Sequence, residues 1–246
     1  TQRSTLFPYT TLFRSPNGAG KSTLLSVLAG ELRPPTGAVT LDARPLAAWS
    51  RLELARRRAL LEQHSPLAAA LRVEDVVLLG RAPHGTPSRD RELARRALDD
   101  VGLAALAARD YVRLSGGERQ RVQLARVLAQ LWDVDDALLL LDEPVSALDV
   151  GAQHHILTRA RDRATRGAAV IVTLHDLNLT AQYADRVVLL DAGRVVAEGP
   201  PDRVLEPTTI SDVYGWDMDL LPDRASGVSW IVPRTRRRRE HSHAAP

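Results

Sequence analysis

One stretch, Ser15 to Thr23, constrains this chain more than any other part of its sequence. Apart from its first residue, it fits the pattern G-x-x-x-x-G-K-[ST]. Glycines in this pattern let the backbone turn tightly enough to aim several N–H groups at one anion, and the helix that follows adds its positive N-terminal end. The stretch therefore predicts a loop that holds the phosphates of a nucleotide. The competing interpretation is a chance match in a glycine-containing turn.

The basic residues support the interpretation as a phosphate loop. Lys21 is the only lysine among the 33 basic residues, and all the others are arginine. A compact ammonium group on a flexible stem binds phosphate differently from a planar guanidinium, and the chain keeps its one ammonium where the pattern needs it. The hydroxyl of Ser22, the next residue of the pattern, is expected to bind Mg²⁺.

The composition is that of a globular protein without thiol chemistry. Of the 246 residues, 44% are hydrophobic and 26% are charged. No apolar run approaches the roughly 18 residues of a membrane span, so any role at a membrane would need a partner. The chain has no cysteine, which excludes disulfides and thiolate chemistry and makes a cytosolic setting the default expectation.

Two terminal segments differ from the rest of the chain. Residues 1–15 contain both phenylalanines but no alanine and no acidic residue, and Thr5 to Ser15 reads like the translation of a common short-read sequencing adapter. We interpret residues 1–15 as a non-native leader fused to a truncated N-terminus; the alternative is an unusual natural leader. Residues 234–246 are predicted to form a disordered basic tail. They are not expected to bind nucleic acid, because no aromatic residues alternate with the arginines.

From Gly20 onward, helical segments alternate with apolar strands, which predicts an α/β domain with a largely parallel sheet. Strands are expected at 39–41, 58–61, 137–141, 169–174, 187–190 and 194–197. Helices are expected at 20–32, 51–57, 73–79, 89–101, 118–131, 152–166, 177–183, 202–205 and 209–213. Helical periodicity dominates about 64–130, so we expect a helical subdomain there, inserted in a domain that spans 16–233.

Two consecutive carboxylates, Asp142 and Glu143, end the apolar run of residues 138–141. In a protein with a phosphate loop, such a strand delivers an acid to the Mg²⁺ site, and the next acid is placed to act as general base toward water. The alternative is an ordinary boundary between a strand and a turn, because Asp-Glu-Pro is also typical of turns.

The segment Leu114 to Glu118, read LSGGE, predicts a second helix N-terminus that could bind an anion. Ser115 and Glu118 also have the spacing of a capping box, in which each residue caps the backbone of the other. The two interpretations are compatible with each other.

In the order of its motifs, the chain resembles the ATP-binding subunits of ATP-binding cassette (ABC) transporters. The motifs that carry the resemblance are the phosphate loop, Gln63, Leu114–Glu118, Leu138–Glu143, Ser146–Asp149 and His175. The resemblance covers roughly residues 15–231, and LSGGE is its most specific motif. It implies a P-loop NTPase core with a mostly parallel sheet and an inserted helical subdomain. The antiparallel strands that precede the phosphate loop in this family are largely missing here.

The resemblance also implies a role for each matching residue. Glu143 would activate the attacking water, His175 would contact the γ-phosphate, and Gln63 would take part in catalysis while sensing a permease. Mg²⁺ would be bound by Ser22, Gln63 and Asp142. ATP would lie between two chains in a head-to-tail homodimer, each chain giving its phosphate loop to one ATP and its LSGGE segment to the other. The nucleotide-binding positions would be Asn17, Gly18, Ala19, Gly20, Lys21, Ser22, Thr23, Ser115, Gly116, Gly117 and Asp149.

Shorter strings point to one branch of the family. The string Val76 to His84 resembles the importers of iron-siderophores, cobalamin and haem, and Ala129–Trp132 together with Tyr214–Trp216 most resembles the ATPases of hemin importers. This implies an ATPase that powers import of hemin or a related iron chelate. Its partners would be an integral-membrane permease dimer and, indirectly, a periplasmic or extracellular binding protein. The chain itself would lie at the cytoplasmic face of the inner (plasma) membrane, attached through the permease. No nucleic-acid partner is expected.

Other functions stay open at this point. The ATPase of a siderophore or cobalamin importer and a catalytically impaired fragment are the nearest alternatives. A translation-associated factor would carry two cassettes and a DNA-repair ATPase would carry long coiled coils, and the sequence shows neither. Ser15 stands where the family has the first glycine of the loop, and the aromatic residue that stacks on adenine is absent. We therefore expect this chain to bind ATP weakly. His154 and His155 lack the partner pattern of metal ligands and are expected at the surface.

Overall fold

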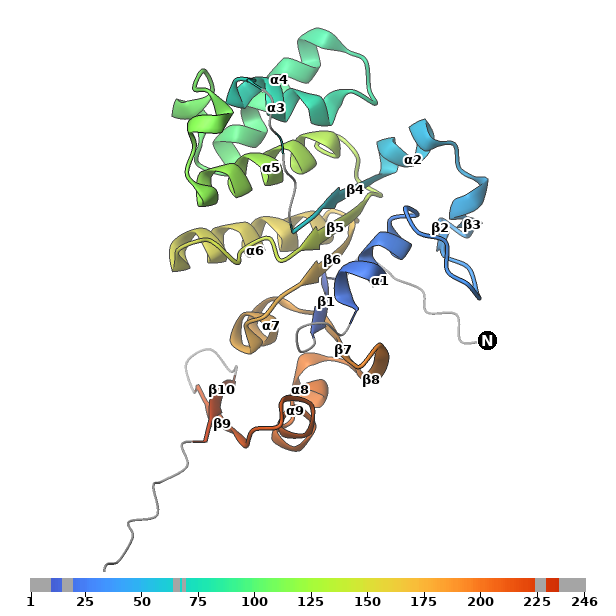
Figure 1. Cartoon of the computed structure of the whole chain (residues 1–246), viewed down its shortest axis with the longest axis vertical. Coiled ribbons are helices and arrows are strands. Elements are labelled where there is room, and N and C mark those ends of the chain that lie inside the picture. The colour runs from blue at the N-terminus through green and yellow to red at the C-terminus, as the bar shows by residue number, and fades with distance from the viewer. Residues whose placement is uncertain (1–9, 15–19, 64–66, 68–69, 224–228, 235–246) are drawn as a thin grey trace, which may run out of the picture.

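The computed structural model describes residues 10–14, 20–63, 67, 70–223 and 229–234. A six-stranded sheet in the order β4-β5-β6-β1-β7-β8 forms its centre (Figure 1). The strands are β1 (Thr10–Arg14), β4 (Arg58–Leu61), β5 (Leu138–Asp142), β6 (Ala169–Thr173), β7 (Arg186–Asp191) and β8 (Arg194–Gly199). All neighbours are parallel except β7 and β8, which form a hairpin. The predicted α/β fold with a mostly parallel sheet is confirmed.

Helices cover both faces of the sheet, which explains why its inner strands are almost wholly apolar. On one face α1 (Lys21–Leu28) packs Leu25 against alternate residues of the strands, among them Leu140 and Ile171. On the other face α6 (Val150–Thr165) and α7 (Leu177–Tyr183) pack against the intervening residues (Figure 1). Every residue of β5 is buried.

The remaining elements lie around this core. Beside β4 lies α2 (Arg51–Arg57), and near β7 and β8 lie α8 (Pro201–Val204) and α9 (Pro207–Tyr214). Two small antiparallel hairpins pair β2 (Thr40–Leu41) with β3 (Arg44–Pro45) and β9 (Met218–Pro222) with β10 (Ser229–Pro233). Short 3₁₀ helices are η1 (Leu46–Ala48), η2 (Leu79–Arg81), η3 (Ala104–Leu106) and η4 (Tyr111–Arg113). Among the described residues, none of the helices combines the length and apolar character that crossing a bilayer requires.

Three helices within the segment of helical periodicity pack against one another above the β4 end of the sheet (Figure 1). They are α3 (Val73–Leu78), α4 (Pro87–Asp100) and α5 (Gly116–Gln130). α3 starts at the predicted residue 73, and the other boundaries differ from the predicted ones by one or two residues. The short η2 helix continues α3 and lies directly on α5.

Gly80, in η2, has no room for a side chain. A β-carbon there would lie 2.1 Å from the backbone oxygen of Arg126 in α5. We expect Gly80→Ala to push η2 off α5 and to destabilise the fold by about 1–3 kcal/mol, a typical cost of overpacking. The melting temperature would fall by roughly 2–4 °C per kcal/mol, measured by thermal unfolding. Gly151→Ala is the control: the added carbon would meet only Asp149 at 3.5 Å, so stability would hold or rise. Equal melting temperatures for the two variants would contradict this packing argument.

The structure extends the sheet upstream of the domain start predicted at Pro16. Thr10–Arg14 forms β1, which lies between β6 and β7 in parallel register, Leu12 pairing with Val172 and Val187. Leu12 is fully buried and Phe13 is 7% exposed. Thus part of the segment interpreted as a foreign leader occupies a central position in the core; residues 1–9 and 15 lie outside the described residues.

The C-terminal boundary also differs by one residue. Arg234, assigned to the tail from the sequence, forms an ion pair with Asp219 of β9, its Nε lying 2.9 Å from the carboxylate. Its backbone N–H donates to the Asp217 oxygen at 2.8 Å. Arg234 therefore belongs to the β9–β10 hairpin. The rest of the predicted tail, residues 235–246, lies outside the described residues.

Candidate active site

The phosphate-loop helix begins where the sequence places it. Gly20 has φ = 95°, a left-handed conformation that favours glycine, and it is the N-cap of α1. Lys21, the first residue of α1, is 7% exposed. The predicted positions Asn17, Gly18 and Ala19 lie outside the described residues.

A cavity of about 230 Å³ opens beside the start of α1. It is lined by Ser22, Leu25, Ser26, Leu60, Glu62, Gln63 and Asp142. The three predicted metal ligands, Ser22, Gln63 and Asp142, thus line the same cavity although they come from α1, the loop after β4 and the end of β5. Their hydroxyl, amide and carboxylate oxygens are the hard donors that Mg²⁺ prefers, so the donor set fits that ion.

The three predicted catalytic side chains meet at Glu143. The amide of Gln63 donates a hydrogen bond to Oε2 of Glu143 at 2.8 Å. Oε1 of the same carboxylate forms a short contact with Nε2 of His175. These residues lie far apart in sequence, but each lies one or two residues after the end of one of the neighbouring strands β4, β5 and β6. Parallel strands bring their carboxyl ends to one edge of a sheet, and that edge is where ligands bind in folds of this kind.

The backbone at Glu143 is held in an unusual conformation. Its φ is 49°, in the left-handed region that a non-glycine residue enters only at a cost. Thr173, fully buried at the end of β6, supports this conformation. Its hydroxyl accepts from the Glu143 N–H at 2.9 Å and donates to Oδ1 of Asp142 at 2.6 Å. Backbone strain that is held in place by such hydrogen bonds is common at functional sites. Here it fixes the direction in which the Glu143 side chain points.

Two further residues fix the Glu143 carbonyl. The side-chain amide of Gln120, in α5, donates to it at 3.0 Å, and the Ser146 hydroxyl donates at 3.2 Å. Sequence reasoning did not assign Thr173 or Gln120 to the site. A threonine closing an otherwise apolar strand, AVIVT, is the one sequence signal that would have pointed to Thr173. Gln120 follows LSGGE by two residues but has no distinguishing pattern of its own.

The LSGGE segment forms the predicted capping box at the start of α5. The Glu118 N–H donates to the Ser115 hydroxyl at 3.3 Å, and the Ser115 N–H donates to the Glu118 carboxylate at 2.7 Å. The hydrogen bond from the Ser115 backbone lowers the pKa of Glu118. Ser115 and Gly116 are exposed, and neither lines the cavity beside α1. This segment is therefore not brought to the nucleotide cavity of its own chain.

Asp149 is the N-cap of α6, because its side chain accepts from the Ala152 N–H at 2.9 Å. Asp149 is exposed, and the neighbouring Val150 is 69% exposed. Gly117 approaches this region closely, since a β-carbon on it would lie 3.1 Å from the Ala147 oxygen. The LSGGE segment and the loop before Asp149 thus lie together on one exposed part of the molecule.

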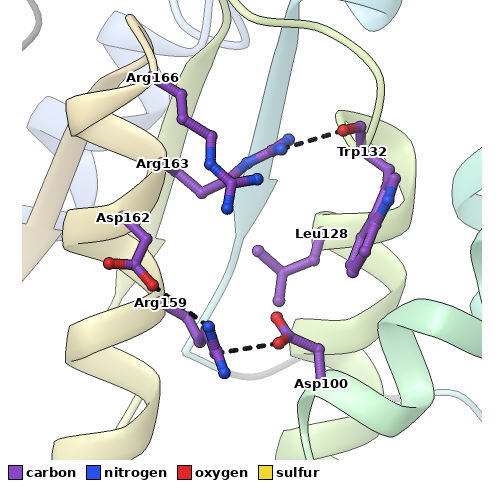
Figure 2. A pocket seen from close by; sticks show the side chains of 7 residues that line it. All are labelled: Asp100, Leu128, Trp132, Arg159, Asp162, Arg163 and Arg166. Carbon is purple, nitrogen blue, oxygen red and sulfur yellow. Dashed lines mark hydrogen bonds and ion pairs between the residues drawn. The ribbon is translucent and has the colours of Figure 1, made fainter.

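A second, smaller cavity of about 100 Å³ lies between α6 and the ends of α4 and α5 (Figure 2). It is lined by Asp100, Leu128, Trp132, Arg159, Asp162, Arg163 and Arg166. Arg159 pairs with Asp100 at 2.9 Å and with Asp162 at 3.2 Å. Arg163 donates to the Trp132 oxygen at 3.0 Å, and burial lowers the pKa of this arginine. Arg159 and Arg163 thus have partners within the protein, and we interpret the cavity as part of the packing interface between the helical segment and α6.

The two adjacent histidines of α6 have ordinary structural contacts. His154 hydrogen-bonds through Nδ1 to the Tyr183 hydroxyl at 2.8 Å, and exposed His155 contacts the Asp100 oxygen. His154 is half-buried, so it lies deeper than the surface position expected from the sequence.

Fold and motifs agree with a match to a known family. Residues 10–146 match the model of the ABC transporter family, and the chain belongs to this family as an ATP-binding, ATP-hydrolysing subunit. In a search of solved structures it is similar to a chain of an ABC transporter in an inward-facing conformation. The TM-score is 0.76 and the identity 29%, over 93% of this chain and 88% of that one.

Curated relatives narrow the comparison. The chain is 50% identical over 224 residues to the hemin import ATP-binding protein HmuV of Gloeobacter violaceus, which covers 89% of this chain and 82% of the relative. It is 55% identical over 221 residues to the protein of the same name from Pseudomonas putida, covering 89% and 87%. The predicted membership of the ABC ATPases is confirmed.

Proposed function

We propose that this chain is the ATPase subunit that powers import of hemin through a membrane permease. The observation that carries the ATPase chemistry is that Gln63 and His175 both contact the carboxylate of Glu143, beside the cavity at the start of α1. The observation that favours hemin is the identity of 50–55% to relatives named hemin import ATP-binding proteins. A siderophore or cobalamin importer is the nearest alternative.

The proposed chemistry divides the work among these residues. Lys21, with the N–H groups at the start of α1, binds the outer phosphates of ATP. Glu143 accepts a proton from water as the water attacks the γ-phosphorus, and the bond from that phosphorus to the bridging oxygen breaks. His175 contacts the γ-phosphate. Ser22, Gln63 and Asp142 would hold Mg²⁺, which neutralises phosphate charge when bound.

A second copy of the chain completes the site in this proposal. Ser115, Gly116 and Asp149 are exposed, Gly117 beside them is half-buried, and none of the four lines the nucleotide cavity, so their binding role needs another molecule. Two chains would enclose two ATP molecules, and loss of the γ-phosphate would release them. The other partners are an integral-membrane permease dimer, which would hold this chain at the cytoplasmic face of the inner membrane, and, through the permease, a periplasmic or extracellular binding protein.

The test of this function uses the chain reconstituted in proteoliposomes with the permease encoded beside its gene. Binding protein loaded with hemin should stimulate ATP hydrolysis, and hemin should accumulate on the opposite side of the membrane. Binding protein loaded with a ferric siderophore or cobalamin serves as the comparison. Stimulation by one of those ligands and not by hemin would contradict the hemin assignment while leaving the ATPase assignment intact.

A separate prediction concerns the first residue of the phosphate loop. The pattern has glycine where this chain has Ser15. If that position needs a left-handed backbone, a residue with a β-carbon costs about 1 kcal/mol there, or about fivefold in affinity. Ser15→Gly should therefore tighten ATP binding about fivefold, measured by titration with a fluorescent ATP analogue. Unchanged affinity would show that Ser15 does not weaken the loop.

A further inference from the structure

Gln130, the last residue of α5, connects the end of that helix to the junction of α2 with β4 and to the turn that contains His84. The proposed mechanism gives these contacts no role. The side-chain amide of Gln130 donates to the Ala55 oxygen at 2.7 Å and to the Arg58 oxygen at 3.0 Å. Ala55 lies in the last turn of α2, and Arg58 is the first residue of β4. The side-chain amide therefore donates to two carbonyls at the junction where α2 ends and β4 begins. Carbonyls at a helix C-terminus lack partners within their own helix, and Gln130 supplies one.

The backbone of Gln130 holds a different segment. Its carbonyl, which also lies at a helix C-terminus, accepts a hydrogen bond from Nε2 of His84 at 2.7 Å. The preceding carbonyl, of Ala129, accepts from the Arg81 guanidinium at 2.8 Å. The turn that contains Arg81 and His84 is thus bound to the end of α5.

Ion pairs of Arg81 stabilise the contact between this turn and the end of α5. Arg81 is only 2% exposed, and it forms ion pairs with Asp90 at 2.9 Å and with Asp133 at 2.9 Å. Burial would raise the pKa of the Asp133 carboxyl, but the hydrogen bond and charge of Arg81 lower it, so the net pKa lies below its usual range. A buried arginine that left two carboxylate partners and its backbone acceptors would leave buried charges unpaired, which is strongly unfavourable. The turn and the end of α5 should therefore move as one unit.

This unit is well placed to act on the catalytic residues. β4 is one of the two edge strands of the sheet, and within the described residues it is hydrogen-bonded to one neighbouring strand, β5. It runs from Arg58, which Gln130 holds, to Leu61, two residues before Gln63. Gln63 in turn donates to Glu143 at 2.8 Å. An edge strand has less backbone support than an inner one, so the hydrogen bonds from Gln130 matter more for its position.

We propose that Gln130 is a positioning residue for ATP hydrolysis, which fixes β4 and thereby Gln63 relative to the turn of Arg81 and His84. A displacement of that turn would reach Gln63 through the end of α5, the α2–β4 junction and β4. The inference rests on the ATPase part of the proposed function and not on the identity of the transported solute.

The first test replaces Gln130 by methionine, which has a similar shape but no amide. We expect kcat for ATP hydrolysis at saturating ATP to fall at least fivefold, with KM for ATP unchanged within twofold, because the phosphate loop is not touched. The matched control is Gln123→Met. That glutamine also lies in α5 and is buried, but its amide donates to the Tyr111 hydroxyl at 2.9 Å within the helical segment. The control should keep kcat within twofold of the wild type.

The second test separates positioning from general destabilisation. In a Gln63→Ala background, Gln130→Met should change kcat by less than twofold, because the group through which it acts is gone. Should Gln130→Met fail to fold, His84→Phe and His84→Gln replace it: the first removes the donor to Gln130 and should lower kcat, and the second keeps a donor and should restore part of it.

Two results would overturn the inference. One is a kcat for Gln130→Met equal to that of Gln123→Met, and the other is an undiminished effect in the Gln63→Ala background. Failure of the hemin assignment would appear elsewhere, as stimulation of the wild-type chain by another loaded binding protein. Absence of any ATP hydrolysis by the wild-type chain would contradict the ATPase chemistry and this inference together.

Discussion

Replacing Glu143 by glutamine should lower kcat for ATP hydrolysis by about 100-fold to 10,000-fold, the usual contribution of a general base. The glutamine amide cannot accept a proton from water. It keeps an oxygen that can accept the hydrogen bond from Gln63, whose Nε2 lies 2.8 Å from Oε2 of Glu143 in the wild type. ATP binding should therefore persist within a few-fold of the wild type. Both quantities are measured on the same preparation, by phosphate release and by titration with a fluorescent ATP analogue.

The control for this prediction is Glu198→Gln. That carboxylate lies on the antiparallel edge strand β8, where it pairs with Arg186 at 2.7 Å, outside the lining of the nucleotide cavity. Loss of this carboxylate should leave kcat unchanged within twofold, because an exposed ion pair contributes little to the stability of the fold. A decrease of less than tenfold for Glu143→Gln would mean that another group accepts the proton.

Replacing Lys21 by arginine should weaken ATP binding at least tenfold although the positive charge is kept. Lys21 is 7% exposed at the start of α1, so the larger planar guanidinium must displace its neighbours. Its ammonium can approach a phosphate oxygen as a point charge, whereas a guanidinium needs a flat, two-pronged approach. The dissociation constant for ATP is the measurement.

The chain offers the opposite exchange as a control, because its other basic residues are arginines. Arg33→Lys, at an exposed position after α1, should leave the dissociation constant unchanged. ATP binding by Lys21→Arg equal to that of the wild type would show that any cation suffices at this position. The presence of the only lysine there would then carry no functional meaning.

The sheet was largely predictable because its strands are short apolar runs between helical segments. Residues 137–141 and 169–174 were expected as strands, and β5 and β6 differ from them by one residue at each end or less. β1 was not expected, since residues 10–14 have a composition unlike the rest of the chain. In the structure β1 lies between β6 and β7, and the side chain of Leu12 is fully buried there. Burial in the core, which composition does not reveal, makes this segment a strand.

The site was predictable in part. The acids at the end of β5 and the histidine after β6 follow directly from strand boundaries. The meeting of Gln63 with Glu143 does not, because nothing in the spacing of two residues 80 positions apart fixes a contact. The family resemblance implied that both residues belong to the catalytic site, and the structure supplies the contact between them. Gln120 was missed because its hydrogen bond to the Glu143 carbonyl leaves no pattern in the sequence. Thr173 was missed although its place at the end of the apolar strand AVIVT gave one signal.

The most direct test of the account is phosphate release from Mg·ATP by the wild-type chain, with Glu143→Gln measured alongside. We predict release that saturates with ATP, is inhibited by vanadate, and falls at least 100-fold in Glu143→Gln. Release by the wild type no faster than by Glu143→Gln would contradict the claim that Gln63, Glu143 and His175 form an ATP-hydrolysing site.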